Sequence, residues 1–121
     1  MKRIALVLLL CIAAGTALAG SNKWRLQVSG GAESDGTITM TLALDDGQKL
    51  PVNVAIKRGT GENAVAKQIR DALRAQASAC CKFEVDDGED VLVKKKRNEP
   101  NFAVTVVENT VQGVRINPDE E

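Results

Sequence analysis

The chain has 121 residues, with 16 basic and 16 acidic side chains, no histidine and no tyrosine. A chain of this length forms one small domain, and the lack of histidine removes the commonest general base, the usual partner of a nucleophilic serine or cysteine, and the commonest metal ligand. We therefore expect a protein that is not an enzyme and that holds no cofactor.

Residues 1–19 have the three zones of an export signal. Two basic residues follow the first methionine, an apolar run covers 4–14, and small residues precede a cut between Ala19 and Gly20. At about 1.5 Å per residue the run is roughly 16 Å long as a helix, which is too short to cross a bilayer core of about 30 Å. We expect cleavage after Ala19 and a periplasmic or secreted product.

Removal of residues 1–19 leaves 14 basic and 16 acidic residues, a net charge near −2. This balance gives no general attraction to nucleic acid or to an anionic membrane. We expect a single α+β domain over 20–117 and a disordered tail over 118–121. The expected partner is another envelope or secreted protein, and the mature form is expected to bind neither nucleic acid nor membrane.

The first predicted elements are strands. Residues 24–28 alternate between apolar and polar side chains, and the alternation is clearer over 37–44 and 50–56, which indicates strands with one buried face. The sequence Asp-Asp-Gly-Gln between the last two strands is a tight-turn signal, so they are predicted to form an antiparallel hairpin. Pro51 cannot donate to a ladder, which places the start of the second strand either at a sheet edge or with Pro51 on its non-bonded side.

Apolar residues then recur at helical spacing over 62–77, which predicts one amphipathic helix with Thr60 as its cap. Further strands are predicted at 83–85, 91–95, 102–108 and 114–116. This order predicts an α+β fold, in which an antiparallel or mixed sheet of six to seven strands carries one amphipathic helix on one face.

The adjacent cysteines Cys80 and Cys81 are the unusual feature of the mature sequence, because Cys11 leaves with the signal. Adjacent Cα atoms lie about 3.8 Å apart, whereas disulfides usually need about 4.4–6.8 Å, so a bond between neighbours is strained and easily reduced. A vicinal disulfide is our first interpretation. The alternatives are a disulfide to a partner, two inert or separately modified thiols, and a soft-metal site. On a strand, one of the two side chains would be buried and the other exposed.

Two charged runs allow both a functional and a structural interpretation. The acidic run 86–90 does not have the spacing of a calcium loop, and a hairpin turn at Asp87-Gly88 explains it without an ion. The basic run 94–97 is either an anion-binding patch or an edge strand that its lysines protect against pairing. We prefer the edge strand, because no aromatic residues are interleaved with the run.

The stretch from Gly36 to Ala77 contains a strand Gly-Thr-Ile-Thr-Met-Thr-Leu, a strand Leu-Pro-Val-Asn-Val and a helix Ala-Val-Ala-Lys-Gln-Ile-Arg-Asp-Ala-Leu. This order resembles the strand-strand-helix module of phage tail-tube-like and flagellar-hook-associated structural proteins. The resemblance implies a hairpin-then-helix topology and a structural or docking role, and it implies no catalytic residues.

The leading hypothesis is a non-enzymatic periplasmic or secreted binding or accessory protein that acts by surface contact. The contact surface is expected on the strand edges and on an outer sheet face. That face is lined by Thr37, Thr39, Thr41 and Asn53. One alternative is a small inhibitor that inserts the segment 85–91 into a hydrolase. Another is a thiol-dependent redox or metal-handling protein that uses the vicinal cysteine pair.

Overall fold

A computed structural model describes residues 20–121 of the protein. Within them the chain forms seven antiparallel strands and one helix, which confirms the α+β class and the predicted strand number. The strands are β2 (Lys23–Ser29), β3 (Gly36–Leu44), β4 (Lys49–Ile56), β5 (Cys81–Asp86), β6 (Asp90–Lys95), β7 (Phe102–Asn109) and β8 (Arg115–Glu120), and the helix is α2 (Glu62–Gln76). The predicted export signal lies outside the described residues, of which Gly20 is the first.

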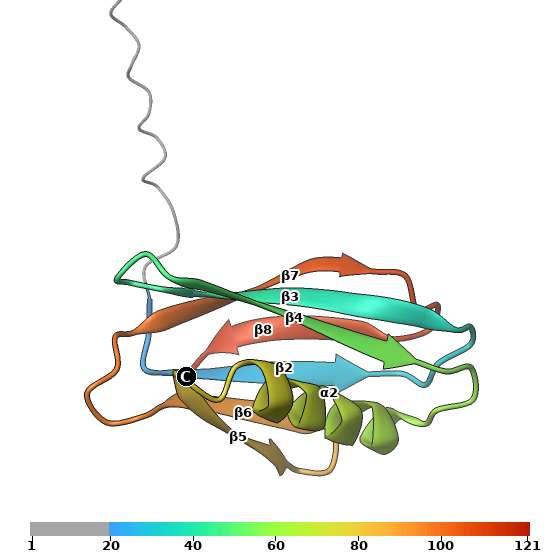
Figure 1. Ribbon diagram of the computed structural model, residues 1–121. Helices are drawn as coiled ribbons and strands as arrows, with labels where there is room; N and C mark the ends of the chain where they lie inside the picture. Colours follow the sequence, from blue (N-terminus) through green and yellow to red (C-terminus); the bar gives the residue numbers. More distant parts are fainter. Residues whose placement is uncertain (1–19) are drawn as a thin grey trace, which may run out of the picture.

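The strands form two sheets, where the sequence predicts one. One sheet has the order β4-β3-β7 and the other β5-β6-β2-β8, and the two lie as stacked layers (Figure 1). Apolar side chains from both layers, among them Leu26, Met40 and Phe102, form one core. A helix about 10 Å wide covers only two or three strands spaced about 4.8 Å apart. The apolar faces of seven strands therefore bury one another.

Helix α2 packs against both layers, because it contacts β4 of one sheet and β5 and β6 of the other. Its apolar stripe, which includes Val65, Ile69 and Leu73, is buried, as the helical spacing predicts. The predicted cap is wrong. Gly61 occupies the cap position, and the Thr60 hydroxyl donates to the Lys57 carbonyl oxygen at 2.7 Å. No helix among residues 20–121 is long and apolar enough to cross a bilayer.

The hairpin of β3 and β4 is confirmed, and β4 is an edge strand, which is one of the two placements that Pro51 allows. Gln76, the last residue of α2, closes this edge. Its side-chain amide accepts a hydrogen bond from the Asn53 N–H and donates one to the Asn53 carbonyl oxygen, both at 2.9 Å. One amide side chain thus makes the two hydrogen bonds that a neighbouring strand would make.

The other three sheet edges also have features that oppose the addition of a strand. Arg74 of α2 donates to the Phe83 carbonyl oxygen at the edge of β5, at 2.9 and 3.2 Å. Pro118, in the middle of β8, has no N–H to donate. On β7, Ser21 already pairs with Phe102, and a β-bulge lies further along the strand. We therefore infer that the strand edges are poorer contact surfaces than the sequence suggests.

The prediction of a disordered tail over 118–121 is wrong, because β8 continues to Glu120 and pairs with β2. Polar side chains of the two strands also meet on the outer face. A carboxylate oxygen of Glu121 lies 3.2 Å from the Arg25 guanidinium, and Asp119 accepts a hydrogen bond from Gln27 at 3.2 Å. The tail is held by main-chain pairing and by charge, neither of which leaves an apolar pattern in the sequence.

Candidate functional site

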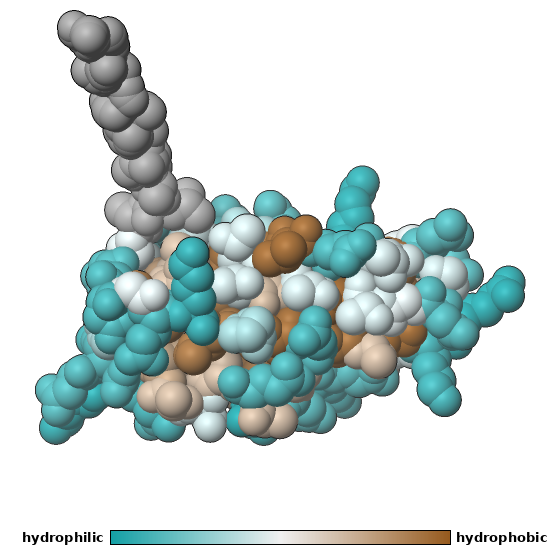
Figure 2. Space-filling view, turned by 45° about the horizontal axis from the view of Figure 1, so that its top comes forward, coloured by the Kyte–Doolittle hydropathy of each residue, from teal (hydrophilic) through white to brown (hydrophobic). Residues whose placement is uncertain are grey.

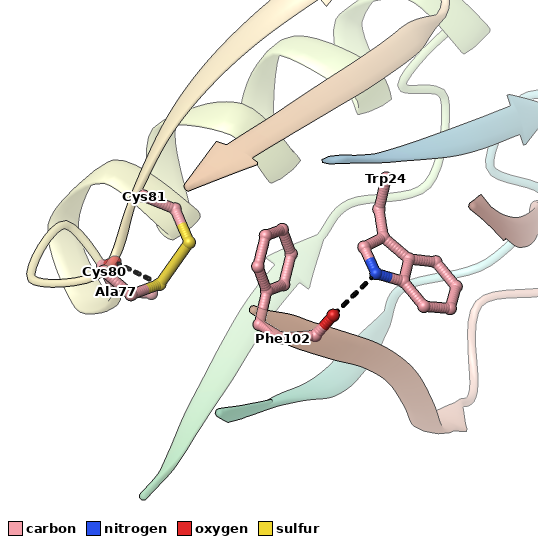
Figure 3. Close-up of a disulfide and its surroundings, with 5 residues drawn as sticks. All are labelled: Trp24, Ala77, Cys80, Cys81 and Phe102. Atoms are coloured by element: carbon pink, nitrogen blue, oxygen red, sulfur yellow. Dashed lines mark hydrogen bonds between the residues drawn. A yellow bond between two sulfur atoms is a disulfide. The ribbon is translucent and has the colours of Figure 1, made fainter. Parts of the chain in front are cut away.

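The sulfur atoms of Cys80 and Cys81 lie at disulfide distance, where the turn after α2 enters β5. Both residues are buried, with exposed fractions of 1 % and 2 %, whereas the strand interpretation predicts that one is exposed. The alternation of side chains does not apply because Cys80 lies in the turn and only Cys81 belongs to the strand. Figure 3 shows the ring of Phe102 between the disulfide and Trp24, in the core.

The main chain of the cysteine pair is joined to the basic run. The Cys80 carbonyl oxygen accepts a hydrogen bond from the Lys96 N–H at 2.9 Å, and Cys81 pairs with Lys95 across β5 and β6. The Cys80 Sγ also lies 3.6 Å from the Ala77 carbonyl oxygen (Figure 3). The pair therefore fixes the point at which the basic run leaves the sheet.

The state of the cysteines can be read from the intact mass of the protein expressed from the complete chain. We expect a monomer without free thiols that gains the mass of two hydrogen atoms on reduction and then accepts two alkyl groups. A free thiol before reduction would contradict the internal bond. A mass that halves on reduction would instead indicate a disulfide to a partner. A third alkylated cysteine, Cys11, would show that the export signal is still attached.

The basic run 94–97 begins on β6, which lies between β5 and β2 and is not an edge strand. The prediction that its lysines protect an edge is therefore wrong. Two hollows lie beside it, and Lys96 lines both. One, of about 330 Å³, is lined by Asn22, Lys23, Lys94, Lys95, Lys96 and Arg97. The other, of about 500 Å³, is lined by Arg74, Ser78, Cys81, Lys82, Phe83, Glu84 and Lys96.

Arg25, on the outer face of β2, is the counterion of the acidic run. Its guanidinium donates to Asp90 at 2.9 Å, to Asp86 at 3.0 Å and to Glu121 at 3.2 Å. These hydrogen bonds, with that to Asp90 the strongest influence, raise the pKa of Arg25 above its ordinary value, although desolvation opposes the shift. The guanidinium is therefore charged at physiological pH.

The acidic run forms the turn of the β5–β6 hairpin, as predicted. Asp87 and Gly88 have positive φ angles of 54° and 82°, which a tight turn requires. Val91 is buried and Val85 half-buried, so the segment 85–91 exposes only its short tip. Among residues 20–121 no three acidic, cysteine or histidine side chains are placed to hold a metal ion.

The outer face of the three-stranded sheet carries hydroxyl, amide and small side chains. We call it the threonine face, and it comprises Thr37, Thr39, Thr41, Ala43, Pro51, Asn53, Ala55 and Thr105. Thr41 lies at its centre, between Pro51 and Thr105, and Thr39 donates to the Asn53 Oδ1 at 2.9 Å. Figure 2 turns this side of the molecule forward, and it shows pale residues across the middle, with brown residues among them and teal residues beside them and towards the ends.

The threonine face brings together Thr37, Thr39, Thr41 and Asn53, which are expected from the sequence to form one contact surface, and Thr105 of β7 lies beside them. Lys49 and Glu108 border it on the outer strands. Val107 is unpaired at the bulge in β7 and is 60 % exposed. Alternation in β7 indicates a strand but does not show that it pairs with β3, so Thr105 could not be assigned from the sequence.

Comparison with models of known protein families gives no match. Comparison with curated proteins likewise gives no match. The structure itself has three candidate features: the buried cysteine pair, the basic run beside it and the threonine face.

Proposed function

We propose that the protein is a non-enzymatic binding or accessory protein of the periplasm or the extracellular space, and that its threonine face contacts another envelope or secreted protein. One observation carries this proposal: a face three strands wide is free of charge except at its borders, in a chain in which 26 % of residues are charged. The central parts of protein interfaces are depleted in charged residues.

Two further observations support this choice of surface. The outer face of the other sheet carries ion pairs, with Arg25 and Lys94 among the cations, so a partner surface without complementary charge would have to desolvate charges there. Each sheet edge has a feature that opposes the addition of a strand, which makes main-chain pairing a less favourable means of contact. The hairpin-then-helix order that resembles structural modules of phage tails and flagellar hooks is consistent with a docking role.

A charge at the centre of the threonine face tests the proposal. We expect the protein carrying Thr41→Lys to lose at least about tenfold in affinity for a partner isolated from the native envelope fraction, because a buried unpaired charge opposes the contact. Gln68→Lys adds the same charge on the exposed face of α2 and should leave binding unchanged. Binding is measured by calorimetry with the purified partner. Equal affinity of the two variants, or the absence of any partner, would contradict the proposal.

A further inference from the structure

Three lysines lie in one row across the outer face of the four-stranded sheet. Lys94 of β6 pairs in register with Lys82 of β5 on one side and with Lys23 of β2 on the other. Neighbouring strands are about 4.8 Å apart, so the row places three ammonium-bearing side chains side by side. Like charges directly opposite each other destabilise a sheet, and folding stability therefore gives no reason for this row.

The row is only partly neutralised. Lys94 has an ion pair with Glu84 at 3.2 Å, and Lys23 has one with Glu121 at 4.0 Å. Glu84 is 54 % exposed, so its pair contributes little to stability. Lys82 has no carboxylate within 4.0 Å among residues 20–121, and the same is true of the three residues that follow Lys94.

The row continues into the basic run that leaves β6, and together they form one surface. We call it the basic end, and it comprises Lys23, Lys82, Lys94, Lys95, Lys96 and Arg97. Two hollows, of about 330 and 500 Å³, meet at Lys96, so the surface is indented. The Cys80 carbonyl oxygen holds the Lys96 main chain in place.

The surroundings of the basic end restrict the kind of anion that fits it. Asp86 and Asp90 lie on the same sheet face, four residues along the strands from Lys82 and Lys94, or about 13 Å at 3.3 Å per residue. A long polyanion that followed the strands would meet these carboxylates, and residues 20–121 carry a net charge near −2. The surface therefore favours a short cluster of negative charges.

The chemistry of the surface also separates the classes of partner. Trp24, Phe83 and Phe102 are all buried, so the described residues offer no exposed aromatic ring on which nucleic acid bases could stack. Val107 is the large apolar residue that is exposed, and it lies on the other sheet, so the basic end has no apolar anchor for a membrane. We propose that the basic end binds a short acidic segment of a partner protein, separately from the contact at the threonine face.

Fluorescently labelled hexaglutamate is the probe for this proposal. Its binding to the protein expressed from the complete chain is followed by fluorescence anisotropy at low and at physiological salt. We expect saturable binding that weakens with salt. The triple variant Lys82→Gln/Lys94→Gln/Lys96→Gln should weaken it about tenfold. The matched triple variant Lys49→Gln/Lys57→Gln/Lys67→Gln removes the same charge elsewhere and should change affinity by less than about twofold.

Unfolding of the same variants supplies a second measurement. Removing the row should leave the midpoint of denaturation unchanged or raise it, because opposed like charges are lost. Equal weakening of hexaglutamate binding by both triple variants would show an effect of net charge alone and would overturn the proposal. It would also be overturned by a lack of hexaglutamate binding, or by tighter lysine-dependent binding of polyphosphate or of a single-stranded oligonucleotide of equal charge.

Discussion

Replacement of Phe102 by alanine is expected to lower the free energy of unfolding by about 3–5 kcal/mol, a large share of the stability of a domain of this size. Its side chain is fully buried in the core shared by the two sheets. Its carbonyl oxygen accepts hydrogen bonds from the Trp24 indole at 2.8 Å and from the Ser21 N–H at 2.9 Å, so β7 is also anchored there to the other layer.

Chemical denaturation followed by tryptophan emission measures this effect, because Trp24 is the single tryptophan of the chain and is buried in the native state. Val107→Ala is the matched control on the same strand. Its side chain is 60 % exposed, and we expect a change within about 0.5 kcal/mol. A loss below about 1.5 kcal/mol for Phe102→Ala would contradict a close-packed core between the two sheets.

Replacement of Arg25 by glutamine is expected to cost about 2–3 kcal/mol at neutral pH. The guanidinium is 19 % exposed and joins Asp86, Asp90 and Glu121. Its loss leaves Asp86 and Asp90 without this counterion and Glu121 with Lys23 alone, at 4.0 Å. Since the pKa of Arg25 is raised, its own charge is lost only at extreme alkaline pH.

Arg70→Gln is the control for this prediction. Arg70 also contacts a carboxylate, that of Asp71, at 3.0 Å, but Asp71 is 62 % exposed and no second acid takes part. We expect a change within about 0.5 kcal/mol. Chemical denaturation of both variants at neutral pH separates the outcomes. A cost for Arg25→Gln that equals that of the control would show that the cluster adds little to the fold.

The elements that could be predicted from the sequence are those whose cause is local. Alternation identified the β3–β4 hairpin, and the missing N–H of Pro51 limited β4 to an edge or Pro51 to a non-bonded position, of which the structure has the edge. Helical spacing identified α2 to within one residue at its end, Gln76. In each case neighbouring residues decide the structure, so no knowledge of distant contacts is needed.

The division into two sheets could not be predicted, because alternation indicates which side chains are buried and not which layer covers them. Leu26 and Met40 have the same pattern, yet they belong to opposite layers. The pairing of Pro118 with Leu26 was hidden for a related reason. Main-chain hydrogen bonds form whatever the side chains are, so a polar segment can complete a sheet without an apolar signature.

The same distinction holds for the candidate sites: contacts between neighbours in the chain could be predicted, and contacts between distant residues could not. Bonding between Cys80 and Cys81 could be proposed because the two residues are adjacent, whereas the burial of both could not. The partners of Arg25 are 61, 65 and 96 residues away in the chain. A lone arginine on an alternating strand, in a sequence with an acidic turn, is a signal that could have suggested this contact. The lysine row gave no comparable signal, because it depends on the register of three strands.

The hydrogen bonds between Gln76 and Asn53 bear on how the protein behaves in a crowded compartment. With the main chain of Asn53 already paired, β4 is a poorer template for the growth of fibrils and swapped dimers. The specificity of a complex then depends more on side chains than on strand pairing. Substitutions that change the partner can accumulate on the flat surfaces while the ladder beneath them stays intact.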